Sequence, residues 1–315
     1  MSARLTSHLQ NGVRSLQRLE DVEQLSPLVW RILGQNGGAY TLQGTCTYLV
    51  GTGKRRLLID AGDADTSDQY IKQLEVAFKR AGSIEGLEGI IVTHWHHDHL
   101  GGVKGLQAKF GPGIPVYKYI PEVEEAGLGG GEMAISAYES YPKEGFTPLS
   151  DGDVIRTQGA TLRAIYAPGH ANDMCVLMLE EEKGSMFTSD NVLGEGTGVI
   201  VNLPDYLKSL QKMRSENPKR LYPGHGAHVD DGSELIDEYI SHRMKRVHEV
   251  EKTLLAHKRS ALTLDQITKN VYGDTLPKEL LPPAMYNVKM ALDVLEAEGK
   301  CEQAEDDSMA WRSKI

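Results

Sequence analysis

Four histidines and one aspartate fall within the six residues that begin at His94, directly after a run of β-branched apolar residues. Neutral imidazole and carboxylate are the usual protein ligands of zinc and similar metals. His94 and His96 are two positions apart on an expected extended loop, so both rings can face one ion. Asp98 and His99 follow on a turn and can face a second position nearby. With 11 histidines in 315 residues, this density is improbable by chance, and the segment predicts a metal site.

Three more ligand-type residues, His170, Asp190 and His225, lie in or beside loops that follow predicted strands. Asp60 stands in the same way at the tip of an earlier strand. Side chains at strand ends can converge on one edge of a sheet sandwich although they are far apart in the sequence, and loops on a rigid scaffold are where functional residues concentrate. Taken alone, Asp190 is more typical of a turn-capping aspartate, so its interpretation as a ligand depends on the other motifs.

The elements that must position these residues read as alternating strands and helices. Strands are predicted at residues 28–33 and, around a Gly-Thr-Gly-Lys turn, at 45–62, and another strand precedes each histidine or aspartate loop. Apolar spacing predicts helices over 68–82 and 233–260, and two more in the C-terminal segment. The Gly-rich stretch at 124–133 reads as a loop without the strand and helix that a phosphate-binding loop needs.

The order of these motifs resembles that of a known family. THWHHDH matches the His-x-His-x-Asp-His signature of the metallo-β-lactamase superfamily, and PGH, SDN and PGHG follow in the family's order. Along the whole chain the sequence is similar to the lactamase-beta-2-like subgroup, whose members include an animal mitochondrial single-strand endoribonuclease and fungal thioesterases that release polyketides from acyl carrier protein. The resemblance implies an α/β protein: an αββα sandwich over residues 1–232, then a long helix and a winged-helix-like C-terminal domain over 233–315.

The resemblance also implies the metal ligands and two zinc ions per chain. The ligands of the first zinc would be His94, His96 and His170, those of the second Asp98, His99 and His225, and Asp190 would bridge the two. Asp98 could instead orient or deprotonate the attacking water, which makes it the candidate catalytic residue. His97 occupies the variable position of the motif and is expected in solvent. His242 could contact substrate or simply be a surface histidine.

Two enzyme classes and one non-enzymatic class remain open. The enzyme classes are a hydrolase of acyl thioesters, of the type that releases polyketides from acyl carrier protein, and a single-strand endoribonuclease. Both reactions need charge stabilisation at a developing oxyanion, which two metal ions provide. The third class is a metal-binding scaffold. The net charge of −10 and the pI of about 5.6 favour a small-molecule or carrier-bound thioester over nucleic acid.

Composition sets the remaining expectations. No window approaches the apolar length of a membrane-spanning helix, and the N-terminal residues lack a signal-peptide pattern, so no membrane partner is expected. Cys46, Cys175 and Cys301 are odd in number and far apart, which is typical of a reducing compartment. The expected location is the cytoplasm, with mitochondria and peroxisomes as alternatives, and the oligomeric state is left open.

Overall fold

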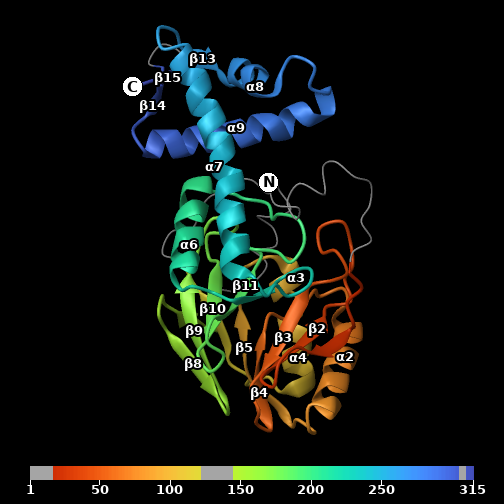
Figure 1. Cartoon of the computed structure of the whole chain (residues 1–315). Helices are drawn as coiled ribbons and strands as arrows, with labels where there is room; N and C mark the ends of the chain where they lie inside the picture. The colour runs from red at the N-terminus through yellow and green to blue at the C-terminus, as the bar shows by residue number, and fades with distance from the viewer. Residues whose placement is uncertain (1–16, 122–144, 305–309) are drawn as a thin grey trace.

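A computed structural model describes residues 17–121, 145–304 and 310–315 of the chain (Figure 1). The Gly-rich stretch at 124–133 lies outside these residues. Within them, two β-sheets face each other, helices cover both outer faces, and a long helix carries a smaller C-terminal unit.

The first sheet has seven strands that lie side by side in chain order. Neighbours from β1 to β4 are antiparallel and those from β4 to β7 are parallel. Because β4 and β5 are parallel neighbours, Asp60 and His94 follow them at the same edge of the sheet. The strands are β1 (Val22–Gln24), β2 (Val29–Leu33), β3 (Cys46–Val50), β4 (Arg55–Ile59), β5 (Gly86–Val92), β6 (Val116–Tyr119) and β7 (Phe146–Leu149).

The second sheet has five strands in the order β12-β11-β10-β9-β8. All neighbours are antiparallel except β11 and β12, so β9, β11 and β12 run in the same direction. The loops after these three strands carry His170, Asp190 and His225, which therefore leave the sheet at one edge. The strands are β8 (Val154–Thr157), β9 (Ala160–Tyr166), β10 (Cys175–Leu179), β11 (Ser185–Ser189) and β12 (Arg220–Pro223).

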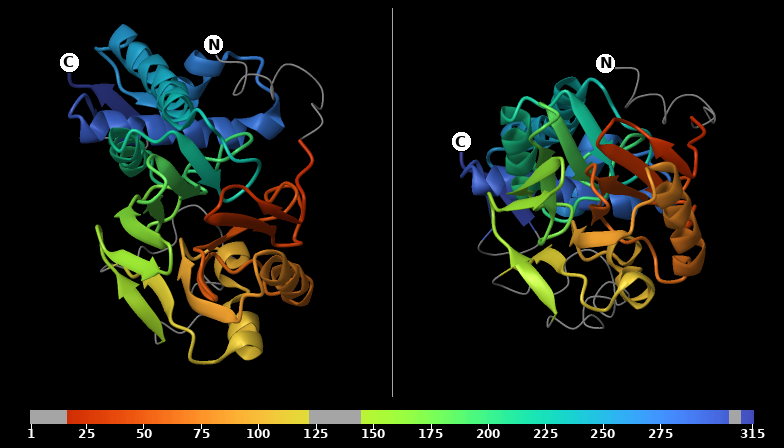
Figure 2. Two further views of the ribbon diagram at one scale, coloured as in Figure 1. Left: turned by 60° about the horizontal axis from the view of Figure 1, so that its bottom comes forward. Right: turned by 90° about the horizontal axis from the view of Figure 1, so that it is seen from below.

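The sandwich has three apolar layers. Side chains such as Leu57 and Ile91 of the first sheet share one core with Leu162 and Leu177 of the second. A second core lies between the first sheet and its outer helices, α2 (Ser67–Arg80) and α4 (Val103–Phe110), and a third lies between the second sheet and α6 (Leu203–Ser215) and α7 (Gly232–Ala256). Figure 2 shows the helices outside the two sheets. This arrangement is the expected αββα sandwich.

The C-terminal unit stands on α7 (Figure 1). A capping box between Thr263 and Gln266 starts α8. The unit shares the third core with the body, because Val288 and Leu292 belong to the same buried cluster as Leu210 of α6. It comprises β13 (Leu262–Thr263), α8 (Leu264–Tyr272), the 3₁₀ helix η1 (Lys278–Leu280), α9 (Leu281–Ala297), β14 (Cys301–Gln303) and β15 (Ala310–Ser313), whose strands form a sheet in the order β13-β15-β14.

Some details differ from the expectations. Asp98 and His99 lie on a short helix, α3 (His97–Leu100), where a turn was expected. Strands β1, β6 and β7 were not expected either, because runs of three or four residues with mixed burial have no readable period.

The three cysteines are separate buried thiols. None of the helices in the described ranges has the length and apolar character needed to span a bilayer.

Candidate metal centre

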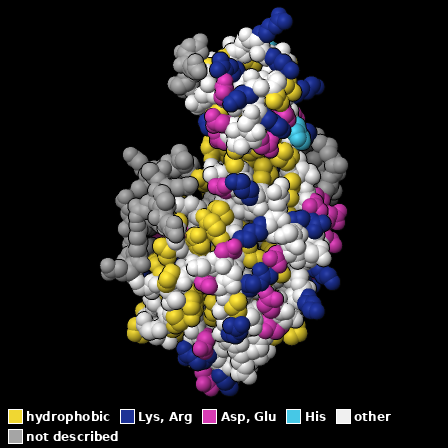
Figure 3. All heavy atoms as spheres, turned by 90° about the vertical axis from the view of Figure 1, so that its left-hand side faces the viewer, with side chains coloured by type: hydrophobic (Ala, Val, Ile, Leu, Met, Phe, Trp, Pro, Cys, Tyr) yellow, Lys and Arg dark blue, Asp and Glu magenta, His cyan; other side chains and the backbone are white. Residues whose placement is uncertain are grey.

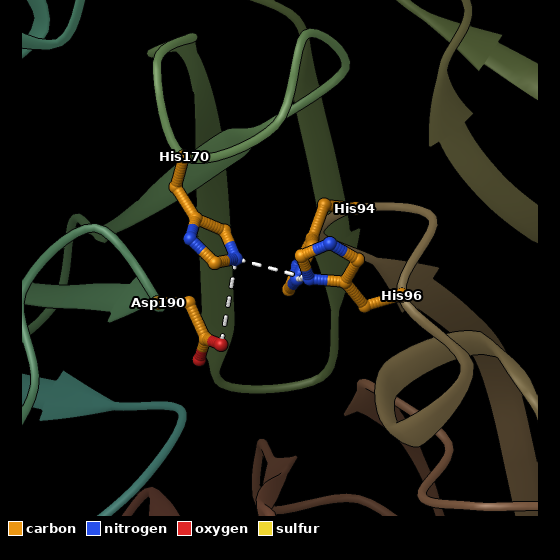
Figure 4. A group of neighbouring side chains, drawn as sticks. All are labelled: His94, His96, His170 and Asp190. Carbon is orange, nitrogen blue, oxygen red and sulfur yellow. Dashed lines mark hydrogen bonds and ion pairs between the residues drawn. The ribbon is translucent and has the colours of Figure 1, made fainter. Parts of the chain in front are cut away.

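The first of two ligand groups at the sheet edge consists of His94, His96, His170 and Asp190. Nε2 of His94 lies 2.8 Å from Nδ1 of His96, and Nε2 of His170 lies 3.0 Å from that same nitrogen. The Asp190 carboxylate approaches Nε2 of His170 to 3.5 Å (Figure 4). Three ring nitrogens and a carboxylate therefore face one point, as the ligands of a tetrahedral ion do.

Hydrogen bonds set which ring nitrogen of each histidine faces this point. The Thr93 hydroxyl donates its single proton to Asp60 and can only accept from His94. Nδ1 of His94, which lies 3.0 Å from the Thr93 oxygen, is therefore the protonated ring nitrogen and donates to that oxygen. Nδ1–H of His170 donates to the carbonyl of Val199 over 2.7 Å. In both rings this leaves the lone pair on Nε2 available to a metal, the arrangement that outer hydrogen bonds impose on ligating histidines.

The second group consists of Asp98, His99 and His225. Oδ2 of Asp98 lies 3.2 Å from Nε2 of His99 and 3.4 Å from Nε2 of His225. Thr45 donates a hydrogen bond of 2.8 Å to Oδ2 of Asp98, and Nδ1–H of His99 donates to Asp60 over 2.8 Å. Asp60 therefore orients His99 as well as Thr93.

Asp190 lies between the two groups. Its Oδ2 faces His170 of the first group, whereas its Oδ1 lies 3.4 Å from Nε2 of His225 and 3.5 Å from Nε2 of His99. One oxygen toward each group is the arrangement of a bridging carboxylate. All seven residues named by the sequence thus come together at one edge of the sandwich.

The electrostatics differ between the groups. Burial lowers the pKa of His94 well below its usual range, and burial together with the neighbouring His170 lowers the pKa of His96 to about 3. Burial acts to lower the pKa of His225 too, but the Asp190 carboxylate raises it to about 9. Burial acts to raise the pKa of Asp190, but His225 and His99 together outweigh burial and hold it well below its usual range. His94 and His96 are therefore neutral and Asp190 is ionised, which are the forms that bind cations, whereas His225 would have to lose its proton when a cation binds.

Unsatisfied polar atoms show that the site fits a metal. Nε2 of His99 and Oδ1 of Asp190 are buried and have no hydrogen-bond partner. Such atoms are rare in folded proteins unless a ligand or water completes them. The donor set of imidazole and carboxylate, without thiolate, is the set that zinc and similar divalent ions bind.

Sequence reasoning missed several residues that hold the ligands. Thr45 and Thr93 bind Asp98 and His94, and Ser189 contacts the Thr93 hydroxyl at 2.8 Å. The position of Thr93 directly before the first ligand was a readable signal for its role. Thr45 gave none, because it is 53 residues from the carboxylate that it contacts.

A buried ion pair also links the ligand loops. Asp173, three residues after His170, accepts a hydrogen bond of 3.4 Å from the backbone N–H of Trp95 and pairs with the buried Lys118 of β6. The loop that carries His94 and His96 is thereby tied to the loop that carries His170.

The other motif histidines do not join the two groups. The His97 side chain is 71% exposed and lies 3.2 Å from Asp63, as expected for the variable position. His242 is exposed on α7. His228 lies 3.9 Å from the exposed Asp230.

Comparisons with known families cover most of the chain. The model of the metallo-beta-lactamase superfamily matches residues 40–225. The model of the beta-lactamase associated winged helix domain matches residues 263–311, which contain the C-terminal unit from α8 to the start of β15. The expected winged-helix extension is confirmed by this match.

Curated relatives match over nearly the full length. The chain is 38% identical over 299 residues to the beta-lactamase-like protein 2 homolog of Caenorhabditis elegans, with 94% of each chain covered. It is 35% identical over 285 residues to an atrochrysone carboxyl ACP thioesterase of Cryptosporiopsis sp., covering 85% of this chain and 79% of the relative. A beta-lactamase domain protein of Burkholderia ambifaria has the same fold, with a TM-score of 0.71, 17% identity and 93% of both chains covered.

Proposed function

The chain belongs to the metallo-beta-lactamase superfamily of hydrolases, and from this premise we propose that it is a dinuclear zinc hydrolase whose substrate is an acyl thioester. The observation that carries the proposal is the placement of Asp190 with one oxygen toward each ligand group.

We further propose residues 1–232 as the catalytic domain and 233–315 as the C-terminal domain. The cytoplasm, a reducing compartment, is the proposed location, because the three cysteines are separate buried thiols.

In this proposal, His94, His96 and His170 hold one ion and Asp98, His99 and His225 hold the other, with Asp190 shared. The chemistry that two such ions supply when bound is activation of water and stabilisation of a developing oxyanion. Asp98 would have a second role besides metal binding. Thr45, His99 and His225 fix the orientation of its carboxylate, and in that orientation it can accept the proton of an attacking water.

The first expected result concerns metal content. Purified protein, desalted after growth with zinc, should contain about two zinc ions per chain, the number that the dimetal template requires. Elemental analysis by mass spectrometry measures this content. His97→Ala is the matched control, because it removes a histidine of the same motif that faces solvent, and its metal content should equal that of the wild type. An active, unchelated preparation without metal would contradict the proposal.

The choice of a thioester rests on similarity and on charge. One relative at 35% identity is named as an ACP thioesterase, so an acyl group on a carrier protein, or a small-molecule thioester, is the proposed partner. The net charge of −10 opposes binding of a polyanion. On the face shown in Figure 3, basic and acidic side chains are interspersed and form no continuous basic patch.

The second expected result is a preference between substrates. With an acyl-carrier thioester and a single-stranded RNA at equal concentration and fixed low salt, the thioester should be hydrolysed and the RNA left intact. Release of free thiol and gel analysis of the RNA measure the two reactions in one vessel. RNA cleavage with the higher efficiency, restored by zinc after chelation, would replace the thioesterase proposal with a single-strand endoribonuclease.

A further inference from the structure

The loop at residues 191–202 connects Asp190 to α6 and contains neither helix nor strand. Its Val199 carbonyl accepts the hydrogen bond from Nδ1–H of His170. That bond sets the tautomer of His170 and the direction of its Nε2. The position of one backbone carbonyl in an irregular loop therefore decides how His170 faces the first ligand group.

The Val199 side chain does not hold this carbonyl in place, because it is 56% exposed. The residues on either side of Val199 are held by side chains from the C-terminal part of the chain. Arg243 of α7 donates from Nη2 to the carbonyl of Gly198 over 3.2 Å. The hydroxyl of Tyr286 on α9 donates to the carbonyl of Ile200 over 2.9 Å.

A third contact fixes the start of the loop. The Tyr239 hydroxyl, also on α7, accepts from the backbone N–H of Leu193 at 3.2 Å and donates to the carbonyl of Gly196 at 2.7 Å. The loop thus meets α7 and α9 at four points, residues 193, 196, 198 and 200.

The helices that carry these side chains are packed against each other. Val250 of α7 and Val288 and Leu292 of α9 are fully buried in one apolar cluster, which fixes the two helices against each other. The guanidinium of Arg243 lies over the ring of Tyr206, with 6.0 Å from its carbon to the ring centroid. A shift of α9 would therefore be transmitted to the loop and, through Val199, to His170.

We propose that Arg243 and Tyr286 are positioning residues for the metal centre: they hold the carbonyls on both sides of Val199, so that α7 and the winged-helix unit together set the orientation of His170 without contributing a ligand. This inference concerns the same site as the proposed function, and its test by zinc affinity rests on that function. It gives the C-terminal unit a task at the reaction centre that its sequence, which contains no histidine after His257, does not reveal.

The test is Tyr286→Phe, which removes one hydroxyl and keeps the ring, which is 39% exposed. Zinc affinity, measured by competition with a chromophoric chelator, should fall by about threefold to tenfold, less than the roughly 10- to 100-fold typical of residues bonded directly to a ligating histidine. Hydrogen exchange of the metal-free protein should become faster at residues 191–202. Arg243→Leu should produce both effects, and Arg243→Lys, which keeps a donor, should recover part of the affinity.

The matched control is Tyr272→Phe, the same chemical change in the same unit. Tyr272 lies on α8 against Arg246, whose guanidinium carbon is 4.1 Å from its ring centroid, and this contact survives without the hydroxyl. Unchanged loop exchange and unchanged zinc affinity in Tyr286→Phe would overturn the inference. If the wild type binds no metal, the proposed function fails, while the exchange measurement on the metal-free protein still decides whether Tyr286 and Arg243 hold the loop.

Discussion

Asp98→Ala is expected to lower hydrolysis by roughly 10²- to 10⁴-fold, the range that a lost proton-transferring group produces, while the protein stays folded. Asp98 is buried at the tip of a short helix and contacts Thr45, His99 and His225, which all belong to the site and not to the apolar cores. Its removal therefore leaves the sandwich intact but takes a carboxylate from the second ligand group. Circular dichroism and initial rates should be measured on the same preparation.

His97→Ala is the control for this experiment, since His97 precedes Asp98 in the same helix and its side chain is largely exposed. Its rate should match that of the wild type. His96→Ala should also lose hydrolysis without unfolding, because His96 supplies the nitrogen that both other rings of the first group approach. Retained turnover in Asp98→Ala would remove Asp98 from the mechanism.

Gly224→Ala is expected to lower the activity by about 100-fold, the upper effect seen for residues one step outside a metal, although it adds only one methyl group. A Cβ at Gly224 would lie 2.2 Å from Oδ1 of Asp190 and 3.0 Å from Cε1 of His99. The Asp190 carboxylate can turn away from this contact, and the backbone carbon of Ser189, at 3.1 Å, needs to give by only a few tenths of an ångström, so the fold can survive. The oxygen that turns away is the one that faces the second ligand group, and zinc content should drop below that of the wild type.

Gly113→Ala is the matched control, because a Cβ at Gly113 meets no atom within 4 Å. Its metal content, rate and melting temperature should equal those of the wild type. Metal content and melting temperature of Gly224→Ala are then compared with those of the control. Full zinc content and a normal rate in Gly224→Ala would show that neither zinc binding nor hydrolysis depends on the observed position of the Asp190 carboxylate.

Much of the site could be predicted from the sequence, because ligand chemistry and strand ends are local properties. The spacing of His94, His96, Asp98 and His99 is readable within six residues. The burial of β10 follows from its unbroken apolar run, and that of the end of β5 follows from Ile90, Ile91 and Val92. The motif order then led, through resemblance, to the αββα fold and the winged-helix unit. Periods of two and 3.6 residues report whether a face is buried, so these elements were found before any contact was known.

Tertiary structure decided what joins these elements, and no local pattern carries that information. The second oxygen of Asp190 faces His225 only because β11 and β12 are parallel neighbours that end at the same edge. Thr45 reaches Asp98 across 53 residues. Tyr286 reaches the loop beside Val199 across 86 residues. Hydrogen bonds of this kind depend on the positions of whole packed elements to within a few tenths of an ångström, whereas sequence periodicity specifies only which face of each element is buried.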